Sequence, residues 1–178
     1  MLLIADIFTE IDKFAENIIF MALEIERKFL VKGDYKPFVT RSVHMKQGYL
    51  CSSEGKTVRI RISGEKGYIT IKGPTPAGSF SRFEWEMEIP LHDAEGLLAM
   101  CDTGLIDKVR HIVPFEGHVF EVDEFAGENQ GLVVAEVELS SEEEEFARPE
   151  WLGREVTGER RYYNSCLLSC PYSKWGED

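Results

Sequence analysis

Charged residues recur at every second position through most of this chain, and this spacing constrains the fold more than any other feature. In LEIERKFLV, the residues Glu24, Glu26 and Lys28 alternate with mostly apolar residues, and similar alternation returns in VRIRI, ITIK, FEWEMEI, KVRH, FEVDEF and VAEVEL. Successive side chains of a β-strand point to opposite faces of the sheet. Each run therefore has one ionic and one mostly apolar face, which is typical of antiparallel sheet.

The turn sequences between these runs, such as SGEKG, PFEG and AGENQG, divide the region into candidate strands. Eight strands are predicted, at 23–31, 45–50, 57–63, 67–72, 81–90, 106–113, 118–125 and 132–140. A helix is predicted over 92–101, with Asp93 as its candidate N-cap. Another is predicted from the acidic run 142–145, because Ser140 and Ser141 precede it as in a capping box; Pro149 limits this helix. The tail 157–170 has helical apolar spacing only toward its end.

Residues 1–20 differ in pattern from the strand-rich region 21–178 that follows. Ile4, Ile7, Ile11 and Phe14 recur at helical spacing, which favours an amphipathic helix. Two interpretations remain open for this extension. It is a helix that docks on the domain or on a partner, or it is upstream translated sequence and Met21 is the natural start; we slightly favour the second.

The net charge restricts the partners and the location that we expect. The chain has 178 residues, and its 32 acidic against 20 basic residues give a formal charge of -12, which argues against binding to nucleic acid or to an anionic membrane through a basic surface. No apolar run approaches the roughly 18 residues of a membrane span, and the start lacks the features of a secretory signal. The four cysteines match no zinc pattern. The sequence predicts a cytoplasmic protein, a monomer or homodimer, without nucleic-acid or membrane partners.

The signs of the charges on the strand faces indicate more than a solvent-exposed sheet. Like charges recur two residues apart, about 6.6 Å along a strand, whereas a solvent-exposed surface normally mixes both signs. Strands with basic faces and strands with acidic faces follow one another in a nearly continuous meander. We therefore predict a mainly β (α+β) fold, in which an eight-stranded antiparallel closed β-barrel has a charged lumen and a few covering helices.

A lumen lined by ions needs compensating ligands, because unpaired buried charges are very costly. The paired carboxylates are hard oxygen ligands of the kind that Mg²⁺ and Mn²⁺ prefer; they are Glu24 with Glu26, Glu84 with Glu86 and Glu136 with Glu138. The basic residues of the same faces suit a phosphate chain; they are Lys28, Arg59, Arg61, Lys72, Lys108 and Arg110. The ligand predicted from these residues is a metal-bound polyphosphate.

The segment Glu24-Ile-Glu26-Arg-Lys28 also matches the E-x-E-x-K signature of the CYTH superfamily, the triphosphate tunnel metalloenzymes. QGYL, VRIRI, ITIK, RFEWEMEI, KVRH, FEVDEFAG, VAEVEL and ERRYYN follow in the order typical of that family. The chain resembles its compact bacterial members over residues 22–168. The resemblance implies an eight-stranded tunnel that binds triphosphate with divalent metal and cleaves a phosphoanhydride bond.

The resemblance also implies roles for individual residues. Metal-binding acids would be Glu24, Glu26, Asp123, Glu136 and Glu138. Substrate-binding bases would be Lys28, Arg59, Arg61, Lys72, Lys108 and Arg110, with Arg160 or Arg161 from the tail. Catalytic roles would fall to Lys28, Glu84 and Glu86, the two acids as metal ligands or as groups that orient water. Gln47 and Tyr49 are expected near the tunnel mouth, where a role in strand packing is equally compatible.

The function predicted from these observations is metal-dependent hydrolysis of inorganic triphosphate to pyrophosphate and phosphate, with Mg²⁺ or Mn²⁺. Positioning and electrostatics carry most of such a reaction, so no Ser or Cys nucleophile is required. Three alternatives stay open: an adenylyl cyclase, a thiamine triphosphatase and a noncatalytic polyphosphate-binding module. The cyclase is less favoured because the sequence has no clear HxRF-type motif. The sequence does not identify the group that activates the attacking water.

Overall fold

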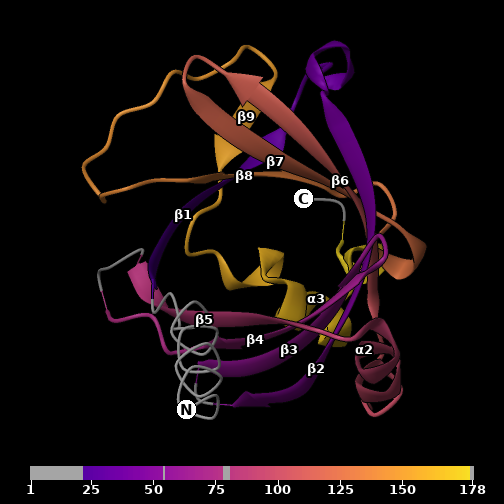
Figure 1. The fold of residues 1–178 in the computed structure, drawn as a ribbon. Coiled ribbons are helices and arrows are strands. Elements are labelled where there is room, and N and C mark those ends of the chain that lie inside the picture. Colours follow the sequence, from indigo (N-terminus) through magenta and orange to yellow (C-terminus); the bar gives the residue numbers. More distant parts are fainter. Residues whose placement is uncertain (1–21, 54, 78–80, 177–178) are drawn as a thin grey trace, which may run out of the picture.

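The main element of the fold is a closed antiparallel barrel, seen along its axis in Figure 1. The computed structural model describes residues 22–53, 55–77 and 81–176. Its strands are β1 (Ala22–Val31), β2 (Arg41–Ser53), β3 (Lys56–Ser63), β4 (Lys66–Lys72), β5 (Ser81–Ile89), β6 (Ile106–Phe115), β7 (His118–Phe125), β8 (Val133–Glu138) and β9 (Leu152–Glu155). Its helices are α2 (Leu91–Leu98) and α3 (Asn164–Ser169), with short 3₁₀ turns at Lys36–Phe38, Gly127–Asn129, Arg160–Tyr162 and Tyr172–Lys174.

The barrel closes because β1 pairs with a different strand along each of its edges. The strand order is β5-β4-β3-β2-β6-β7-β8-β1, and an additional pairing of β5 with β1 joins the two ends. In that pairing Ala22 lies opposite Glu84, and Ile25 lies opposite Ser81. The predicted eight-stranded closed barrel is therefore confirmed.

A ninth strand was missing from the sequence prediction. β9 lies outside the closed barrel and pairs with the far end of β1, where Phe29 faces Glu155 and Val31 faces Leu152. Four residues are too few to produce a recognisable alternation. The approach is close: a Cβ atom on Gly153 would lie 2.8 Å from the Leu30 carbonyl oxygen, so only glycine fits there without a shift.

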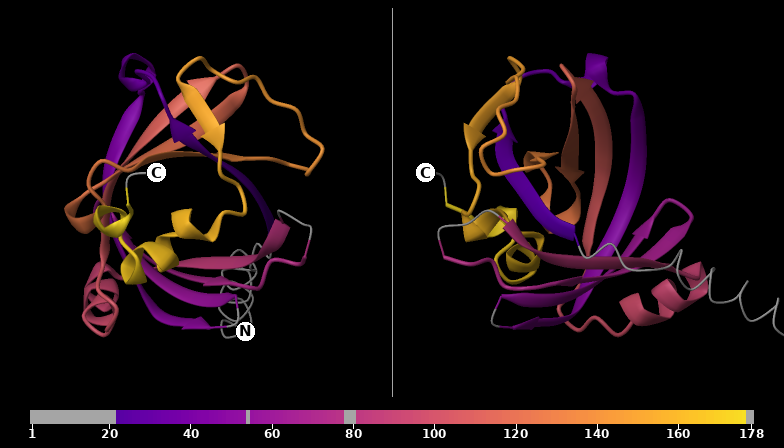
Figure 2. Two further views of the ribbon diagram at one scale, coloured as in Figure 1. Left: turned by 180° about the vertical axis from the view of Figure 1, so that it is seen from behind. Right: turned by 60° about the vertical axis from the view of Figure 1, so that its left-hand side comes forward.

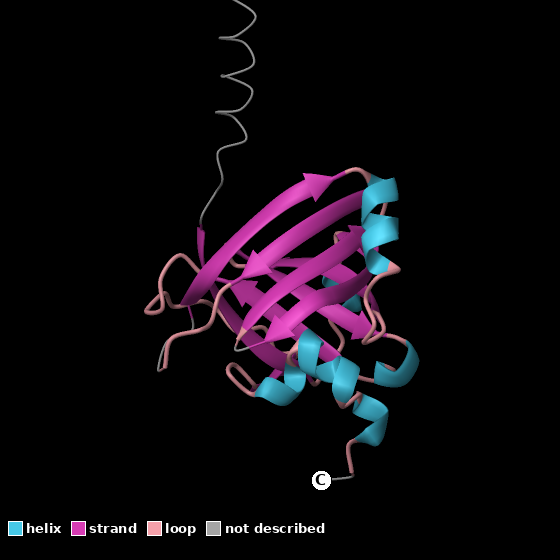
Figure 3. Ribbon diagram, turned by 90° about the horizontal axis from the view of Figure 1, so that it is seen from below, coloured by secondary structure: helices cyan, strands magenta, loops and turns pink. Residues whose placement is uncertain are grey.

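The hydrophobic core lies outside the barrel wall, as the inward-facing charges require. Three apolar clusters separate the wall from the elements that cover it. The first packs Phe29 and Phe120 against Trp151 of the segment before β9, and the second packs Ile106 and Phe125 against the C-terminal tail. In the third, α2 covers β3 and β4, with Ile60 fully buried beneath Ala94 and Leu98. Figure 3 shows the helices on the outside of the strands.

Two details of the predicted helices were wrong. Pro90 occupies the N-cap position of α2, and Asp93 lies in the first turn, so Asp93 is not the cap. The acidic run 142–145 forms no helix; the Glu144 carboxylate accepts hydrogen bonds from the backbone N–H and the hydroxyl of Ser140, each at 2.5 Å. The tail helix is confirmed as α3, which lies at one end of the barrel (Figures 1 and 2).

The predicted amphipathic segment 1–20 lies outside the described residues. All four cysteines are free thiols. Among the described residues, no helix combines the length and the apolar character needed to span a membrane.

Candidate active site

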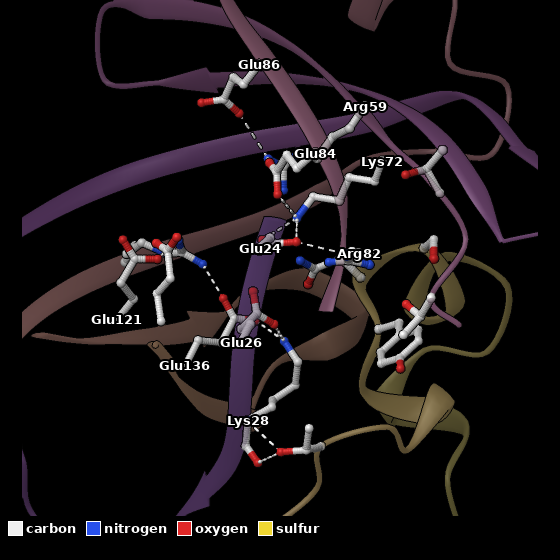
Figure 4. Close-up of a pocket in the computed structure, with 18 of the residues that line it drawn as sticks. Glu24, Glu26, Lys28, Arg59, Lys72, Arg82, Glu84, Glu86, Glu121 and Glu136 are labelled. Atoms are coloured by element: carbon white, nitrogen blue, oxygen red, sulfur yellow. Dashed lines mark hydrogen bonds and ion pairs between the residues drawn. The ribbon is translucent and has the colours of Figure 1, made fainter. Parts of the chain in front are cut away.

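The barrel encloses a cavity of about 850 Å³ whose described lining is mostly ionic. Eight glutamates and six lysine or arginine side chains contribute to it, together with His118. Figure 4 shows the labelled side chains among them converging from β1, β3, β4, β5, β7 and β8. Because both signs are present, each described cation of the cavity is already engaged by carboxylates of the protein.

The seam between β1 and β5 carries the most crowded part of this network. Lys72 Nζ lies 2.7 Å from Glu24 Oε1 and 2.8 Å from Glu84 Oε2. Arg82 Nε donates a hydrogen bond of 2.8 Å to the second oxygen of Glu24. One ammonium and one guanidinium group therefore hold two carboxylates together at the closing seam.

The pKa values of the two seam carboxyls are shifted in opposite directions, although both groups contact Lys72. Burial, followed by the hydrogen bond with Glu24, raises the pKa of Glu84 to about 7. Burial also opposes ionisation of Glu24, but the charges of Lys72 and Arg82 and the hydrogen bond from Glu84 bring its pKa below the ordinary range. Near neutral pH, Glu84 is the carboxyl that retains a proton for part of the time.

A second network joins Lys28 of β1 to β6 and β8. Lys28 Nζ contacts the Glu136 carboxylate and lies 2.9 Å from Glu26 Oε1. Arg110 bridges Glu136, at 2.8 Å, and Glu121. Burial disfavours the charged form of Lys28, but the charges of Glu136 and Glu26 outweigh it, so its pKa lies above the ordinary value.

Arg59 and Arg61 of β3 form the third network with Glu86 of β5. Their guanidinium groups lie 3.2 Å and 2.7 Å from the two carboxylate oxygens of Glu86. Thr70, which is fully buried, donates a hydrogen bond of 2.5 Å to the same carboxylate and accepts one of 3.1 Å from Arg59. The Nε atoms of both arginines are buried and have no hydrogen-bond partner among the described residues.

Lys108 and Asp123 lie deeper than predicted, and neither lines the cavity. Both side chains are 1% exposed, and Lys108 Nζ lies 2.5 Å from Asp123 Oδ2. Arg110, which does line the cavity, donates two further hydrogen bonds of 2.7 Å to Asp123. Burial lowers the pKa of Lys108 to about 8. The Asp123 carboxylate is thus occupied by cations of the barrel wall.

Arg161 is also placed away from the described lining of the cavity. Its guanidinium carbon lies 4.0 Å from the centre of the Trp175 ring, a stacking contact within the C-terminal tail. Of the two residues expected near the mouth, Tyr49 lines the cavity, and Gln47 is buried and donates a hydrogen bond of 3.1 Å to the Tyr49 hydroxyl.

Several lining residues were missed in the sequence prediction. Arg82 shares the inward face of β5 with Glu84 and Glu86, so the same period-two argument would have found it; Glu121 was placed on the charged face of its strand with Asp123 but was given no site role. Thr157 and the segment 163–165 line the cavity from the tail. No strand periodicity marks those positions, because Thr157 lies in a turn and 164–165 begin α3.

The carboxylates provide suitable donors for a hard divalent cation, although no cluster is preformed. Among the described residues, no three Asp, Glu, His or Cys side chains are already gathered as a metal-binding group. Burial and the neighbouring carboxylates of Glu24 and Glu121 nevertheless raise the pKa of Glu138. This part of the cavity holds more negative charge than its cations compensate, and a divalent cation with oxygen ligands would relieve that repulsion.

The sequence matches one known family over most of its length. The profile of the CYTH domain matches residues 22–164. This chain belongs to the CYTH family. A relative named as an inorganic triphosphatase, from Acetivibrio thermocellus, is 47% identical over 88% of this chain and 100% of its own length. Another, an inorganic triphosphatase of Nitrosomonas europaea, is 36% identical over 83% of this chain and 99% of its own length.

A solved structure supports the same fold. The crystal structure of an inorganic triphosphatase has a TM-score of 0.60 to this chain and is 33% identical, covering 83% of this chain and 95% of the other. The predicted family and the tunnel-like fold are both confirmed.

Proposed function

We propose that this CYTH protein hydrolyses inorganic triphosphate to pyrophosphate and phosphate inside the barrel, with Mg²⁺ or Mn²⁺. The observation that carries the proposal is the lining of the cavity, where six cations face eight carboxylates. A phosphate chain suits the cations, and a divalent metal suits the carboxylates. The relatives named as inorganic triphosphatases support the choice of substrate.

Binding in this cavity is an exchange of partners. Lys72, Arg59 and Arg61 are held by glutamates in the ligand-free protein. When phosphate oxygens take over these cations, the released carboxylates need new positive partners. A metal-bound triphosphate supplies both at once. Glu24, Glu26, Glu136 and Glu138 are the acids that we assign to the metal, which would supply charge neutralisation for the phosphate oxygens.

The protein's own groups then act by position and charge. The six cations that line the cavity would hold the phosphate chain and offset charge on the leaving pyrophosphate. They are Lys28, Arg59, Arg61, Lys72, Arg82 and Arg110. Glu84 is the carboxyl best suited to accept the proton of the attacking water, because its pKa of about 7 lets it exist in both forms near neutral pH. Glu86, bonded to Arg59 and Arg61, is assigned to the orientation of that water.

The lining favours an inorganic chain over an organic triphosphate. A nucleobase or a thiamine ring needs apolar walls, and Val119, Tyr49 and Tyr163 are the described side chains of that character that line the cavity. The cyclase and thiamine triphosphatase alternatives therefore have less support from these residues. A noncatalytic phosphate-binding module would not need the glutamate pairs at the seam.

The function is tested by offering the purified chain triphosphate, ATP and thiamine triphosphate, each with Mg²⁺ or Mn²⁺. Phosphate, pyrophosphate and cyclic AMP are measured. We expect triphosphate to be hydrolysed fastest, and Lys72→Ala and Glu26→Ala each to lower the rate by about 100-fold, the loss typical of removing one preorganised charged group. Lys66→Ala, which removes a surface ion pair with Glu88, is the control. Unchanged hydrolysis in both lumen variants would contradict the site assignment.

A further inference from the structure

One edge of β1 changes its pairing partner at Lys28. β5 pairs with this edge from Ala22 to Ile25, and β9 pairs with it from Phe29 onward. Neither strand supplies the partner for the Lys28 N–H, which donates a hydrogen bond of 3.0 Å to the hydroxyl of Thr157. The Lys28 carbonyl oxygen accepts the backbone N–H of Val156 at 2.8 Å. The two residues after β9 therefore fix both backbone polar groups of Lys28.

The direction of the Thr157 hydrogen bond is set by its other partner. Two acceptors lie within reach of the Thr157 hydroxyl: Glu155 Oε1 at 2.8 Å and, at the longer distance of 3.4 Å, the Lys28 carbonyl oxygen, which already accepts the Val156 N–H. Glu155 also accepts hydrogen bonds from Arg27, at 2.8 Å and 2.5 Å, and the bonds from Arg27 hold its pKa below the ordinary value. An ionised carboxylate only accepts hydrogen bonds, so the Thr157 hydroxyl gives it its single proton. The oxygen lone pairs of Thr157 are then left for the Lys28 N–H.

The residue held by this backbone contact carries one of the charged groups of the cavity. The Lys28 ammonium group contacts Glu136 and lies 2.9 Å from Glu26 Oε1 (Figure 4). Glu26 comes from the same strand, two residues earlier, and Thr157 itself borders the cavity. A shift of the Lys28 peptide would move the ammonium group and disturb both carboxylate contacts. Displacements on the order of 1 Å are enough to slow a reaction that depends on positioning.

We propose that Thr157 is a positioning residue of the cavity. Its hydroxyl, oriented by Glu155, holds the Lys28 peptide at the point where the edge of β1 changes its pairing partner from β5 to β9. This contact fixes the positions of the Lys28 ammonium group and the Glu26 carboxylate. Thr157 acts through the backbone of Lys28. The kinetic consequence rests on the proposed function, whereas the structural consequence does not.

The kinetic test compares Thr157→Val with Thr157→Ser in the full chain. Valine keeps the shape and loses the hydroxyl, and serine keeps the hydroxyl. For Mg²⁺-dependent triphosphate hydrolysis we expect kcat to fall roughly tenfold or more in the valine variant with KM within about threefold, and the serine variant to retain most of the parental kcat. Thr40→Val is the matched control, because the Thr40 hydroxyl bonds the Ile112 carbonyl oxygen on the outside of the barrel. Equal kcat values in the valine and serine variants would overturn the proposal.

A second readout needs neither metal nor turnover. Amide hydrogen exchange of Lys28, followed by NMR in the ligand-free protein, should be about threefold to tenfold faster in Thr157→Val than in Thr157→Ser, the ratio expected for one lost hydrogen bond. If the parent protein does not hydrolyse triphosphate, the proposed function fails, and the exchange rates still decide the role of Thr157. If Thr157→Val does not fold, Glu155→Gln weakens the same contact and must accelerate Lys28 exchange. Unchanged Lys28 exchange in the folded variants would overturn the proposal.

Discussion

Glu24 and Glu84 meet at the ammonium group of Lys72, whose Nζ atom lies 2.7 Å and 2.8 Å from their carboxylates at the seam that closes the barrel. The seam is thus joined by side chains as well as by the backbone pairing of β1 with β5. Because one of the two carboxyls retains a proton near neutral pH, the stability of the seam depends on pH.

The first prediction concerns this pH dependence in metal-free protein. The pKa of Glu84 is raised from 4.5 to about 7 in the fold. Between these values the folded chain binds a proton that the unfolded chain has released, so the Glu84 contribution to the free energy of unfolding decreases as pH rises from 4.5 to about 7. Glu84→Gln cannot ionise and should lack this decrease. Urea denaturation with a chelator at a series of pH values measures it.

Glu95→Gln, on the exposed face of α2, is the control for the removal of one carboxylate. Its stability should follow the parent protein at every pH. Stability curves of equal slope for Glu84→Gln and the parent between these pH values would rule out the raised pKa.

The second prediction concerns the buried contacts of Asp123. Asp123→Ala should lower the free energy of unfolding by about 3–5 kcal/mol, because it leaves buried cations without their carboxylate. Lys108 can release its proton, but Arg110 cannot. Lys66→Ala, which breaks an ion pair with both side chains more than half exposed, should cost less than about 1 kcal/mol. Urea denaturation at neutral pH compares the two variants; similar losses would contradict the burial of this network.

The third prediction concerns charge at the cavity. Glu144 lines it and is held by Ser140, whose hydrogen bonds lower the pKa of Glu144 to about 2, so this group is ionised at neutral pH. Glu144→Gln removes one negative charge from the path of a polyanion. We expect kcat/KM for triphosphate to rise roughly twofold at low salt and the gain to vanish near 1 M salt, where the Debye length is about 3 Å.

Glu143→Gln removes the same charge from an exposed neighbour outside the described cavity lining and is the matched control. An equal gain in both variants would indicate a general charge effect. A gain that persists at high salt would mean that Glu144 acts by contact.

The fourth prediction concerns Arg82, which the sequence prediction omitted. Its guanidinium group reaches Glu24 and borders the cavity, so Arg82→Met should raise KM for triphosphate about tenfold, the loss of roughly 1.4 kcal/mol of charge-assisted binding. Arg41→Met, on an exposed position of β2, should leave KM unchanged. Initial rates over a range of substrate concentrations decide the point, and equal KM values for the two variants would exclude a binding role.

The strands and their inward faces were predictable, because alternation of side chains is a local property of the backbone. Glu24, Glu26 and Lys28 illustrate it: their common face follows from spacing alone. The pairing of β1 with β5 could only be inferred from the charge argument, since it joins residues about 60 positions apart. β9 was missed because four residues with two charges contain no periodic signal.

Depth within the cavity was the other property that spacing could not predict. Lys108 and Arg110 share one strand face, yet Lys108 is sealed against Asp123 and Arg110 borders the cavity. The helix expected at 142–145 failed for a related reason. Glu144 bonds to Ser140 and to His118 of β7. The contact with His118 forms only when the chain has folded, so the local sequence could not predict it.

Because the core lies outside the barrel wall, the residues that stabilise the fold by apolar packing are different from those that line the cavity. Side chains such as Ile60 and Phe120 hold the scaffold from the outer surface, whereas the inner surface carries the charges. A substitution on the inner face that keeps its ion pairs balanced therefore leaves the packing of the apolar clusters intact. We expect the same outer packing to support other arrangements of the inner charges, and therefore other polyanionic ligands.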